Sequence, residues 1–400
     1  MTATRNYHAP DGTFRKVLPP DRARREVAGW RAVATMFPVP LLRDVRDVAD
    51  GCEVVYEDVF ASGRCRWLLA DSINSADRHP GDAGAVRALV DRVCDDLLTA
   101  AEATGVSGRL EECVPDLYAE RLDPGGRLDR WYTCPPRPAW VIDGQRLDLC
   151  DLASRTWVVN GRALGCGWPA ALTGLRSVLA GHTRWATAIT QGDVTEPNIT
   201  DPLCWLDFEY AGRNALAGDV ANFLWYLLGM GGWLVPAYQP EVYARTLRIP
   251  LPPAAVPLID RLRVTARYVE IDCTWRVGVG RHAALAALLR RLAGDLGTVL
   301  SPAGDVAAAL RPFLVVRVLG VIPLRQLSGP HAMACLAKIT ELSCPALTLP
   351  GWCVAVPAAP PSAAGAGCCG PAVPSATVAE NLPEEHHDRP SPRSADHPRR

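Results

Sequence analysis

Hydrophobic residues recur at helical spacing over most of the chain after about residue 82. The most regular stripe predicts a long helix with one buried face. Its apolar positions are Val86, Leu89, Val90, Val93, Leu97 and Leu98. Another helix is expected over residues 168–188, and helices with proline-containing breaks are expected from Gly218 to about residue 345. Residues 189–209 interrupt this pattern and predict strands.

The first seventy residues follow a different pattern, in which short strands surround one helix. Residues 6–9 and 13–18 are strand candidates separated by a Pro-Asp-Gly turn. A helix is expected from about Arg22 to Met36, because its apolar residues are spaced three and four apart. Two more strands are expected at 53–60 and 66–70. The order β-β-α-β-β predicts a small antiparallel sheet with one helix packed on it.

These two patterns predict an α+β protein with two lobes. The N-terminal lobe is expected to cover residues 1–72 and the helical lobe residues 73–353. A chain of 400 residues is long enough to build a sizeable core in both. Residues 354–400 are rich in Pro, Ala and Ser without any period, so we expect them to be disordered.

Charge and composition give no sign of a nucleic-acid or membrane partner. The formal net charge is -1, from 42 basic and 43 acidic residues. No apolar run of about 18 residues is expected, and the N-terminus lacks the apolar core of a signal peptide. The expected location is therefore the cytoplasm. Nothing in the sequence indicates an oligomeric state.

Two rarer residue types add to this picture. The 14 cysteines are scattered without any Cys-x-x-Cys pair, so we interpret most of them as small buried apolar residues. Only two of the 42 basic residues are lysines, Lys16 and Lys338, and the others are arginines. Against this bias, a lysine at a given position favours a role that needs a compact ammonium group.

Candidate chemistry lies in the strand-rich interruption. Asp193 follows Gly192, and Asn198 stands five residues after Asp193. Asp207 comes next, directly after the strand-like Cys204–Leu206. An aspartate can accept the proton of a hydroxyl group, and the oxygens of an asparagine and a second aspartate suit Mg²⁺. Asp-x4-Asn is also the spacing of the protein-kinase catalytic loop.

These motifs resemble the aminoglycoside phosphotransferase and choline kinase superfamily. The likeness rests on residues 191–198 (QGDVTEPN), 206–212 (LDFEYAG) and 218–223 (GDVANF). It implies a two-lobed protein-kinase-like fold and a kinase that uses ATP and Mg²⁺. It also implies that Asp193 is the catalytic base, that Asn198 and Asp207 are metal ligands, and that Asp219 is structural.

The N-terminal lobe offers the other half of a kinase site. A kinase needs a cation on a strand to contact the nucleotide phosphates and a helical glutamate to orient that cation. Lys16 lies on the strand before the early helix, and Glu26 lies on that helix. From the layout of the family, adenine is expected against the backbone around Ala70–Ile73, which makes Asp71 and Ser72 candidate cofactor-binding residues.

Two departures from the family pattern leave the function open. Gln191 stands where the family usually has His, and only one strand and a turn precede the Lys16 strand. The start site is misassigned, or phosphate contacts come from elsewhere, or nucleotide binding is impaired. The leading hypothesis is a kinase for a hydroxyl of an amino alcohol, an aminoglycoside or a sugar-like metabolite. A pseudokinase-like binding protein and a helical structural protein with accidental motifs are the alternatives.

Overall fold

The structure is a computed structural model. It describes residues 5–114, 117–165, 167–179, 181–249, 257–344, 348–353 and 356–357. Most of the tail that was expected to be disordered, residues 354–400, lies outside the described residues. The exception is strand β16 (Val356–Pro357), which pairs in parallel with strand β15 (Tyr268–Val277). The expectation of disorder is wrong for these two residues.

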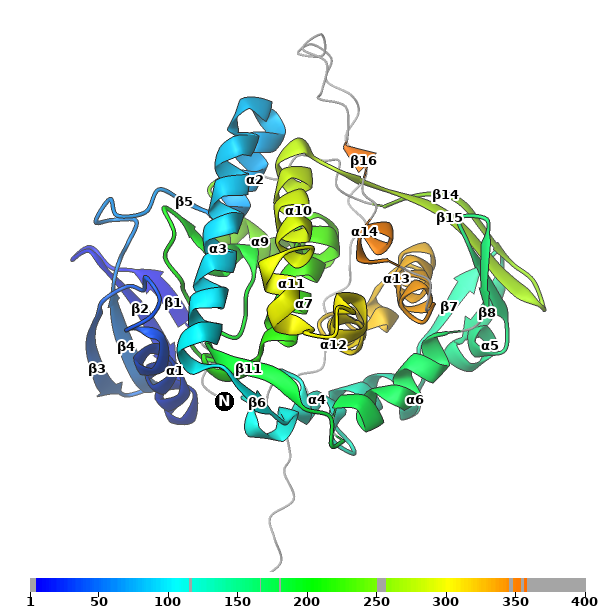
Figure 1. The fold of residues 1–400 in the computed structure, drawn as a ribbon, viewed down its shortest axis with the longest axis horizontal. Coiled ribbons are helices and arrows are strands. Elements are labelled where there is room, and N and C mark those ends of the chain that lie inside the picture. Colours follow the sequence, from blue (N-terminus) through cyan, green and yellow to red (C-terminus); the bar gives the residue numbers. More distant parts are fainter. Residues whose placement is uncertain are drawn as a thin grey trace, which may run out of the picture. The chain divides into compact units, whose positions relative to one another are not determined.

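The N-terminal lobe is a four-stranded antiparallel sheet with one helix, as the sequence predicts (Figure 1). Its elements are β1 (Arg5–His8), β2 (Thr13–Leu18), α1 (Pro20–Val33), β3 (Leu42–Val48) and β4 (Gly51–Glu57). The order across the sheet is β1-β2-β4-β3. The sequence did not reveal β3, because this edge strand is largely charged and exposed and so lacks a hydrophobic face.

The strand expected at 66–70 is not part of this sheet. Only β5 (Trp67–Leu68) is extended, and it pairs with β12 (Thr200–Asp201) of the helical lobe. Helix α2 (Leu69–Arg78) begins immediately afterwards. Asp71 stabilises the start of this helix, because its carboxylate accepts hydrogen bonds from the backbone N–H groups of Leu68, Arg248 and Ile249.

This local structure contradicts the adenine site predicted at Ala70–Ile73. Asp71 and Ser72 lie buried in the first turn of helix α2 instead of in a connecting segment, and the Ser72 hydroxyl donates a hydrogen bond to Asp201 (3.2 Å). The Asp71 carboxylate is likewise used by three backbone donors. Neither residue is therefore available to a nucleotide.

The larger lobe is built on long helices, as expected. Helix α3 (Ala83–Thr104) carries the predicted stripe, of which Val86, Leu89, Val90, Val93 and Leu97 are buried. It packs beside α10 (Val279–Leu292), while α12 (Val306–Gly320) packs on α7 (Leu216–Trp225) (Figure 1). The other helices of at least six residues are α6 (Trp168–Leu179), the π-helix η6 (Tyr226–Leu234), α9 (Pro240–Thr246), α11 (Asp295–Leu300) and α13 (Gly329–Leu342).

Short elements fill the connections of this lobe. The short helices are η1 (Pro80–Asp82), η2 (Leu110–Glu112), α4 (Ala119–Leu122), η4 (Asp129–Thr133), α5 (Leu149–Ala153), η5 (Glu196–Asn198), α8 (Val235–Tyr238), η7 (Leu324–Gln326) and α14 (Leu349–Trp352). Strands β7 (Ala139–Ile142) and β8 (Gln145–Asp148) form a hairpin, and β6 (Val106–Gly108), β11 (Trp185–Thr190) and β13 (Gly212–Ala215) form a small sheet in the order β13-β11-β6. The helix expected over 168–188 therefore ends at Leu179, and a strand follows it.

A second sheet was missed by the sequence-based prediction of helices up to residue 345. Strands β14 (Pro257–Val264) and β15 form a long hairpin, next to which lie β9 (Thr156–Val159) and β10 (Arg162–Gly165). Buried residues alternate along β15, at Val269, Ile271, Cys273, Trp275 and Val277. A period of two residues specifies a strand with one buried face, which is why this segment is not helical.

One further expectation needs correction. The continuous helical segment Leu216–Tyr238 is long and apolar enough to cross a membrane by length and composition, contrary to the expectation of no such run. About 83% of its most apolar window is buried inside the protein. Trp225 and Trp233 on this segment are almost completely buried, so it forms part of the core among the described residues.

Most of the described cysteines are buried, in agreement with their interpretation as small apolar residues. The buried ones are Cys52, Cys65, Cys94, Cys113, Cys204, Cys273, Cys335 and Cys353. Both lysines are buried too. Lys338 donates a hydrogen bond to the Trp352 carbonyl (2.8 Å) and pairs with Glu341 (2.9 Å), so it serves the core of the larger lobe.

Candidate active site

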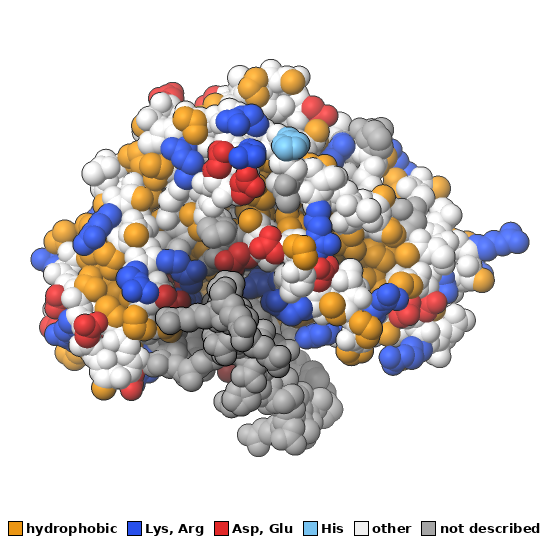
Figure 2. Space-filling model, turned by 90° about the horizontal axis from the view of Figure 1, so that it is seen from below, with side chains coloured by type: hydrophobic (Ala, Val, Ile, Leu, Met, Phe, Trp, Pro, Cys, Tyr) orange, Lys and Arg blue, Asp and Glu red, His pale blue; other side chains and the backbone are white. Residues whose placement is uncertain are grey.

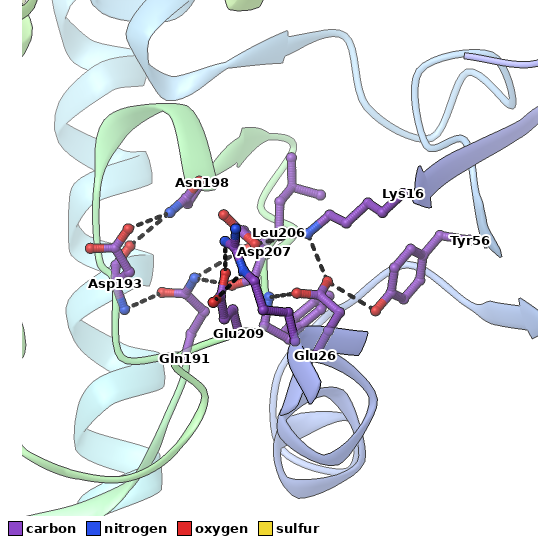
Figure 3. A network of polar contacts seen from close by, with 11 residues as sticks. Lys16, Glu26, Tyr56, Gln191, Asp193, Asn198, Leu206, Asp207 and Glu209 are labelled. Atoms are coloured by element: carbon purple, nitrogen blue, oxygen red, sulfur yellow. Dashed lines mark hydrogen bonds and ion pairs between the residues drawn. The ribbon is translucent and has the colours of Figure 1, made fainter. Parts of the chain in front are cut away.

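Lys16 is the centre of the site that joins the two lobes. Its Nζ atom lies 2.7 Å from Glu26 Oε1 and 2.7 Å from Asp207 Oδ1 (Figure 3). Burial opposes the charge of Lys16, but the two carboxylates outweigh it and raise the pKa of the ammonium group above its usual value. Burial raises the pKa of Glu26, whereas Lys16 holds the pKa of Asp207 below its usual range despite burial.

Helix α1 connects the sheet to the loop that carries Asp207. Glu26 is buried, and besides Lys16 it accepts hydrogen bonds from Tyr56 Oη (3.0 Å) and from the Phe208 N–H (3.2 Å). A Cβ atom on Gly29 would overlap the Phe208 carbonyl oxygen, so only glycine allows the helix to approach this closely. The lysine, the helical glutamate and the aspartate thus come together from three separate elements.

The predicted base, Asp193, lies in the loop after β11. Its Oδ1 atom accepts a hydrogen bond from Asn222 (2.9 Å) and its Oδ2 atom accepts one from Asn198 (3.2 Å). Burial raises the pKa of Asp193, and the Arg317 guanidinium opposes that rise. The side chain remains about one-quarter exposed, so its carboxylate is accessible to solvent.

Gln191 holds this loop in place at the position where the family that the sequence resembles usually has a histidine. Its amide nitrogen donates to the carbonyl oxygens of Leu206 (2.8 Å) and Asp207 (2.5 Å), while its amide oxygen accepts from the Asp193 N–H (2.9 Å) (Figure 3). The side chain is fully buried. Three neutral hydrogen bonds therefore tie the Asp193 loop to the Asp207 loop, and no charge is needed at this position.

Two backbone features complete the loops. Gly192 has φ of 84°, and a Cβ atom there would overlap the Tyr210 carbonyl oxygen. Asp207 has φ of 61°, which an L-residue other than glycine rarely adopts. Such a conformation persists where surrounding contacts hold it, and here Lys16 and Gln191 supply these contacts.

Asp219 is hydrogen-bonded to the strand residue that precedes this loop. Its Oδ2 atom accepts a hydrogen bond from Thr190 Oγ1 (2.5 Å), directly before Gln191 in the chain. Its Oδ1 atom is buried and has no hydrogen-bond partner among the described residues. Burial raises the pKa of Asp219 to about 7, against the opposing effects of Thr190 and Arg317.

The predicted metal ligands provide a donor set that fits Mg²⁺. Asn198 uses its amide nitrogen for Asp193, which leaves its oxygen as the donor, and Asp207 keeps one carboxylate oxygen beyond the one that contacts Lys16. The Asp207 side chain is 44% exposed. Hard cations such as Mg²⁺ take one or two such protein oxygens and complete their shell with water and phosphate.

A cavity of about 620 Å³ lies beside these groups, within the range typical of small-molecule sites. Lys16, Asn198 and Asp207 are among its polar lining residues, together with the carboxylates of Glu26, Glu57 and Asp58. Phe14, Val59, Phe60, Leu68 and Leu206 are among its apolar lining residues. Figure 2 views the molecule from below, and near the middle of that face acidic and basic side chains lie beside one another.

The connecting segment that borders this cavity is Asp58–Phe60, not Ala70–Ile73. Asp58 holds the segment in a turn, because its carboxylate accepts hydrogen bonds from the N–H groups of Phe60 and Ala61, both at 3.0 Å. The Val59 N–H makes no hydrogen bond to any described residue. The sequence places this connection between the two strands expected at 53–60 and 66–70, the second of which is not part of the sheet.

Sequence reasoning also missed the ion pair that holds the middle of the catalytic loop. Glu196 lies in η5 between Asp193 and Asn198, and its carboxylate is bridged by both terminal nitrogens of Arg281 on α10. Both side chains are fully buried, and Arg281 also donates to the Leu227 carbonyl (3.1 Å). Neither residue stands out in the sequence, because the pairing joins positions 85 residues apart.

Sequence reasoning also missed the hydrogen bonds that join Glu209 to helix α1. Glu209 accepts hydrogen bonds from Arg22 Nε (2.8 Å) and from Arg25 (3.2 Å) on α1. The Asp207 loop is therefore attached to α1 on both of its sides, by Glu26 through Phe208 and by Glu209.

No protein-family model matches the chain, and no curated protein sequence matches it. Among solved structures, an aminoglycoside phosphotransferase from Streptomyces rimosus is 16% identical, with 72% of this chain and 93% of that chain covered at a TM-score of 0.30. A glucosamine kinase in complex with glucosamine, ADP and inorganic phosphate is 14% identical, with 85% and 73% covered at a TM-score of 0.35. At such scores neither match carries weight for this chain.

The described residues themselves identify the fold. An antiparallel sheet carrying a buried lysine, one helix carrying its glutamate partner, and a helical lobe carrying Asp193, Asn198 and Asp207 form a two-lobed, protein-kinase-like α+β fold.

The Glu196–Arg281 pair yields a stability prediction. Replacing Arg281 with Met leaves a buried carboxylate unpaired, so we expect a loss of about 3–5 kcal/mol in the free energy of unfolding, measured by urea titration. Arg290→Met is the matched control on the same helix, because Arg290 pairs with Asp91 at the exposed surface and should cost less than about 1 kcal/mol. Equal losses in the two variants would contradict a special role for the buried pair.

Asp219 yields a prediction about pH. Its pKa of about 7 in the folded protein exceeds the ordinary 3.8, so the folded state keeps a proton that the unfolded chain releases. The contribution of Asp219 to stability is therefore full below about pH 4 and is lost as the pH rises to about 7, by up to about 1.4 kcal/mol per pH unit. Urea titrations between pH 4.5 and 7.5 should show that the free energy of unfolding falls less steeply with pH in Asp219→Asn than in the unaltered protein. If the two proteins lose stability in parallel, the raised pKa of Asp219 is refuted.

Proposed function

We propose that this chain is an ATP- and Mg²⁺-dependent phosphotransferase that transfers a phosphoryl group to a hydroxyl of a small molecule. The observation that carries the proposal is the position of Lys16, 2.7 Å from both Glu26 and Asp207 and beside a cavity of suitable size. A structural protein has no need for a buried ammonium group shared between two carboxylates at the edge of a cavity, whereas a kinase uses that group to hold phosphates.

In this proposal Lys16 contacts the nucleotide phosphates, and Glu26 orients it. Glu26 is itself fixed by Tyr56 and by the Phe208 N–H, so the ammonium position is set before nucleotide binds. Asn198 and Asp207 would hold Mg²⁺, which, when bound, neutralises negative charge on the phosphates. The apolar lining around Phe14, Val59 and Leu206 would enclose the adenine ring, with the Val59 N–H as the donor to its edge.

Asp193 orients the acceptor hydroxyl and takes its proton. As the terminal phosphorus–oxygen bond of ATP breaks toward ADP, the acceptor oxygen bonds to phosphorus and its proton passes to the Asp193 carboxylate. Burial raises the pKa of that carboxylate, which improves its proton affinity. Asn222 and Asn198 keep the carboxylate in place by hydrogen bonds to its two oxygens.

The pseudokinase alternative rested on Gln191 and on the short region before Lys16. The three hydrogen bonds of Gln191 provide a structural reason for glutamine, so this position no longer favours loss of activity. Whether the protein phosphorylates an acceptor decides between an active kinase and a pseudokinase-like binding protein.

Nucleotide binding is tested first through Lys16. The intact protein should melt at a higher temperature with Mg-ATP, and Lys16→Met should remove this shift. Lys16→Arg should not restore it, because a guanidinium fork cannot place one nitrogen 2.7 Å from both carboxylates in this buried position. Arg15→Gln, on the same strand, is the control and should retain the shift. A full shift in Lys16→Met would remove Lys16 from the nucleotide site.

Turnover is tested through Asp193. In an assay of ADP release with a panel of hydroxyl acceptors, Asp193→Asn should lower kcat by about 10²–10⁴-fold, as expected for loss of a general base. The affinity for Mg-ADP should stay within about twofold, because Asp193 does not line the nucleotide cavity. Binding of Mg-ATP without any acceptor-dependent ADP release across the panel would favour the pseudokinase.

A further inference from the structure

Three arginines converge at the end of helix α12, next to Asp193. Arg317 lies on this helix, and its Nη2 atom is 3.7 Å from Asp193 Oδ1. Arg127 donates a hydrogen bond to the carbonyl oxygen of Gly320, the last residue of α12 (3.0 Å). Arg121, on the short helix α4, lies against the same helix end, since a Cβ atom on Gly320 would be 3.4 Å from Arg121 Cδ and 3.5 Å from Nη1.

Arg121 forms no ion pair with a described residue, although its charge and that of Asp193 influence each other. It is only 7% exposed, and its Nε and Nη1 atoms are buried without a hydrogen-bond partner. Arg317 Nη2 also lacks a hydrogen bond, although Arg317 Nε donates to Tyr118 Oη (3.0 Å). Burial, together with the nearby Arg317 and Arg127, lowers the pKa of Arg121 to about 9, so the group stays charged at neutral pH.

Among the described residues, the carboxylates near the three arginines carry less negative charge than the cluster carries positive charge. The carboxylates close to Arg317 are Asp193 and Asp219, and the pKa of about 7 leaves Asp219 partly protonated at neutral pH. The carbonyl groups at the C-terminal end of α12 favour a nearby cation, but this effect is small compared with the cost of burying an unpaired charge. Buried charges in proteins are normally paired, so an anion at this position would lower the free energy of the buried cluster.

We propose that Arg121 and Arg317 form an anion-binding subsite that holds a carboxylate or phosphate of the acceptor while its hydroxyl contacts Asp193. This inference rests on the proposed phosphotransferase function. Guanidinium groups suit both anions because they donate paired N–H bonds in a plane. Arg317 lies within 3.7 Å of Asp193, so one small molecule can reach the base and the subsite together.

The subsite changes the expected acceptor. Amino alcohols and aminoglycosides carry positive charge, which the cluster of Arg121, Arg127 and Arg317 repels. A hydroxy acid or a phosphorylated sugar instead supplies the missing negative charge. The acceptor is therefore an anionic hydroxyl compound, and of the three classes left open by the sequence only a sugar-like metabolite can have this chemistry.

Binding of inorganic phosphate tests the subsite directly. The full-length protein is first saturated with Mg²⁺ and the non-hydrolysable analogue AMPPNP, so that the nucleotide phosphate positions are filled, and phosphate is then titrated by calorimetry. We expect measurable binding that Arg121→Gln weakens at least 10-fold and Arg121→Lys weakens less, because the lysine keeps the charge. Arg109→Gln is the control, since Arg109 lies at the surface and pairs with Glu111, and it should bind as the unaltered protein does.

No phosphate binding, or equal binding by Arg121→Gln and Arg109→Gln, would overturn the subsite. Circular dichroism and the affinity for Mg-AMPPNP show whether each variant is folded. The protein could bind phosphate in a way that Arg121→Gln weakens and yet release no ADP with any acceptor. That result would support the anion site and reject the kinase function. If the protein phosphorylates a cationic acceptor but does not bind phosphate, the kinase function is supported and the anion site is rejected.

Turnover of matched acceptors shows which anion is used. Glucose, gluconate and glucose 6-phosphate compare a neutral compound with a carboxylate and a phosphate, and choline and glucosamine represent cations. An anionic member should have at least a 10-fold higher kcat/KM than its neutral counterpart. Arg121→Gln should raise the KM for that acceptor at least 10-fold with a smaller change in kcat, as expected for a residue that binds but does not react. A preference for choline or glucosamine would contradict the proposal.

Discussion

The structure depends on one buried cation, the ammonium group of Lys16, which is shared between Glu26 of helix α1 and Asp207 of the larger lobe. Removing a charge from water is costly unless partners surround it, so Lys16 can be buried only when strand β2, helix α1 and the Asp207 loop are all in place. The left-handed backbone of Asp207 and the close approach of Gly29 follow from the same requirement.

Hydrogen bonds from uncharged side chains hold the loops around this ion cluster. Gln191 links the Asp193 loop to the Asp207 loop, Asn198 and Asn222 hold the Asp193 carboxylate, and Thr190 attaches Asp219. These four donors bring no charge of their own into the loops. The glutamine that departs from the family pattern is therefore compatible with an ordered site, because the geometry of its amide meets the same need.

Two buried arginines near the catalytic loop differ in how their charge is met. Arg281 is paired with the Glu196 carboxylate and fixes the loop, whereas Arg121 Nε and Nη1 are buried without a hydrogen-bond partner among the described residues. The first arrangement is satisfied within the folded chain, but the second would be stabilised further by an added anion. This contrast separates an arginine that builds the site from one that is available to a ligand.

The sequence by itself determined the lobes, the long helix α3, the loop residues Asp193, Asn198 and Asp207, and the pairing candidates Lys16 and Glu26, because these depend on local periodicity and on short motif spacing. The tertiary structure alone decided the rest. It replaced Asp71 and Ser72 by Asp58–Phe60 at the cavity, revealed the charged edge strand β3 and the β14–β15 hairpin, and brought Glu196 to Arg281 and Arg121 to Arg317. These features arise from contacts between distant segments, and such contacts leave no periodic signal in the chain.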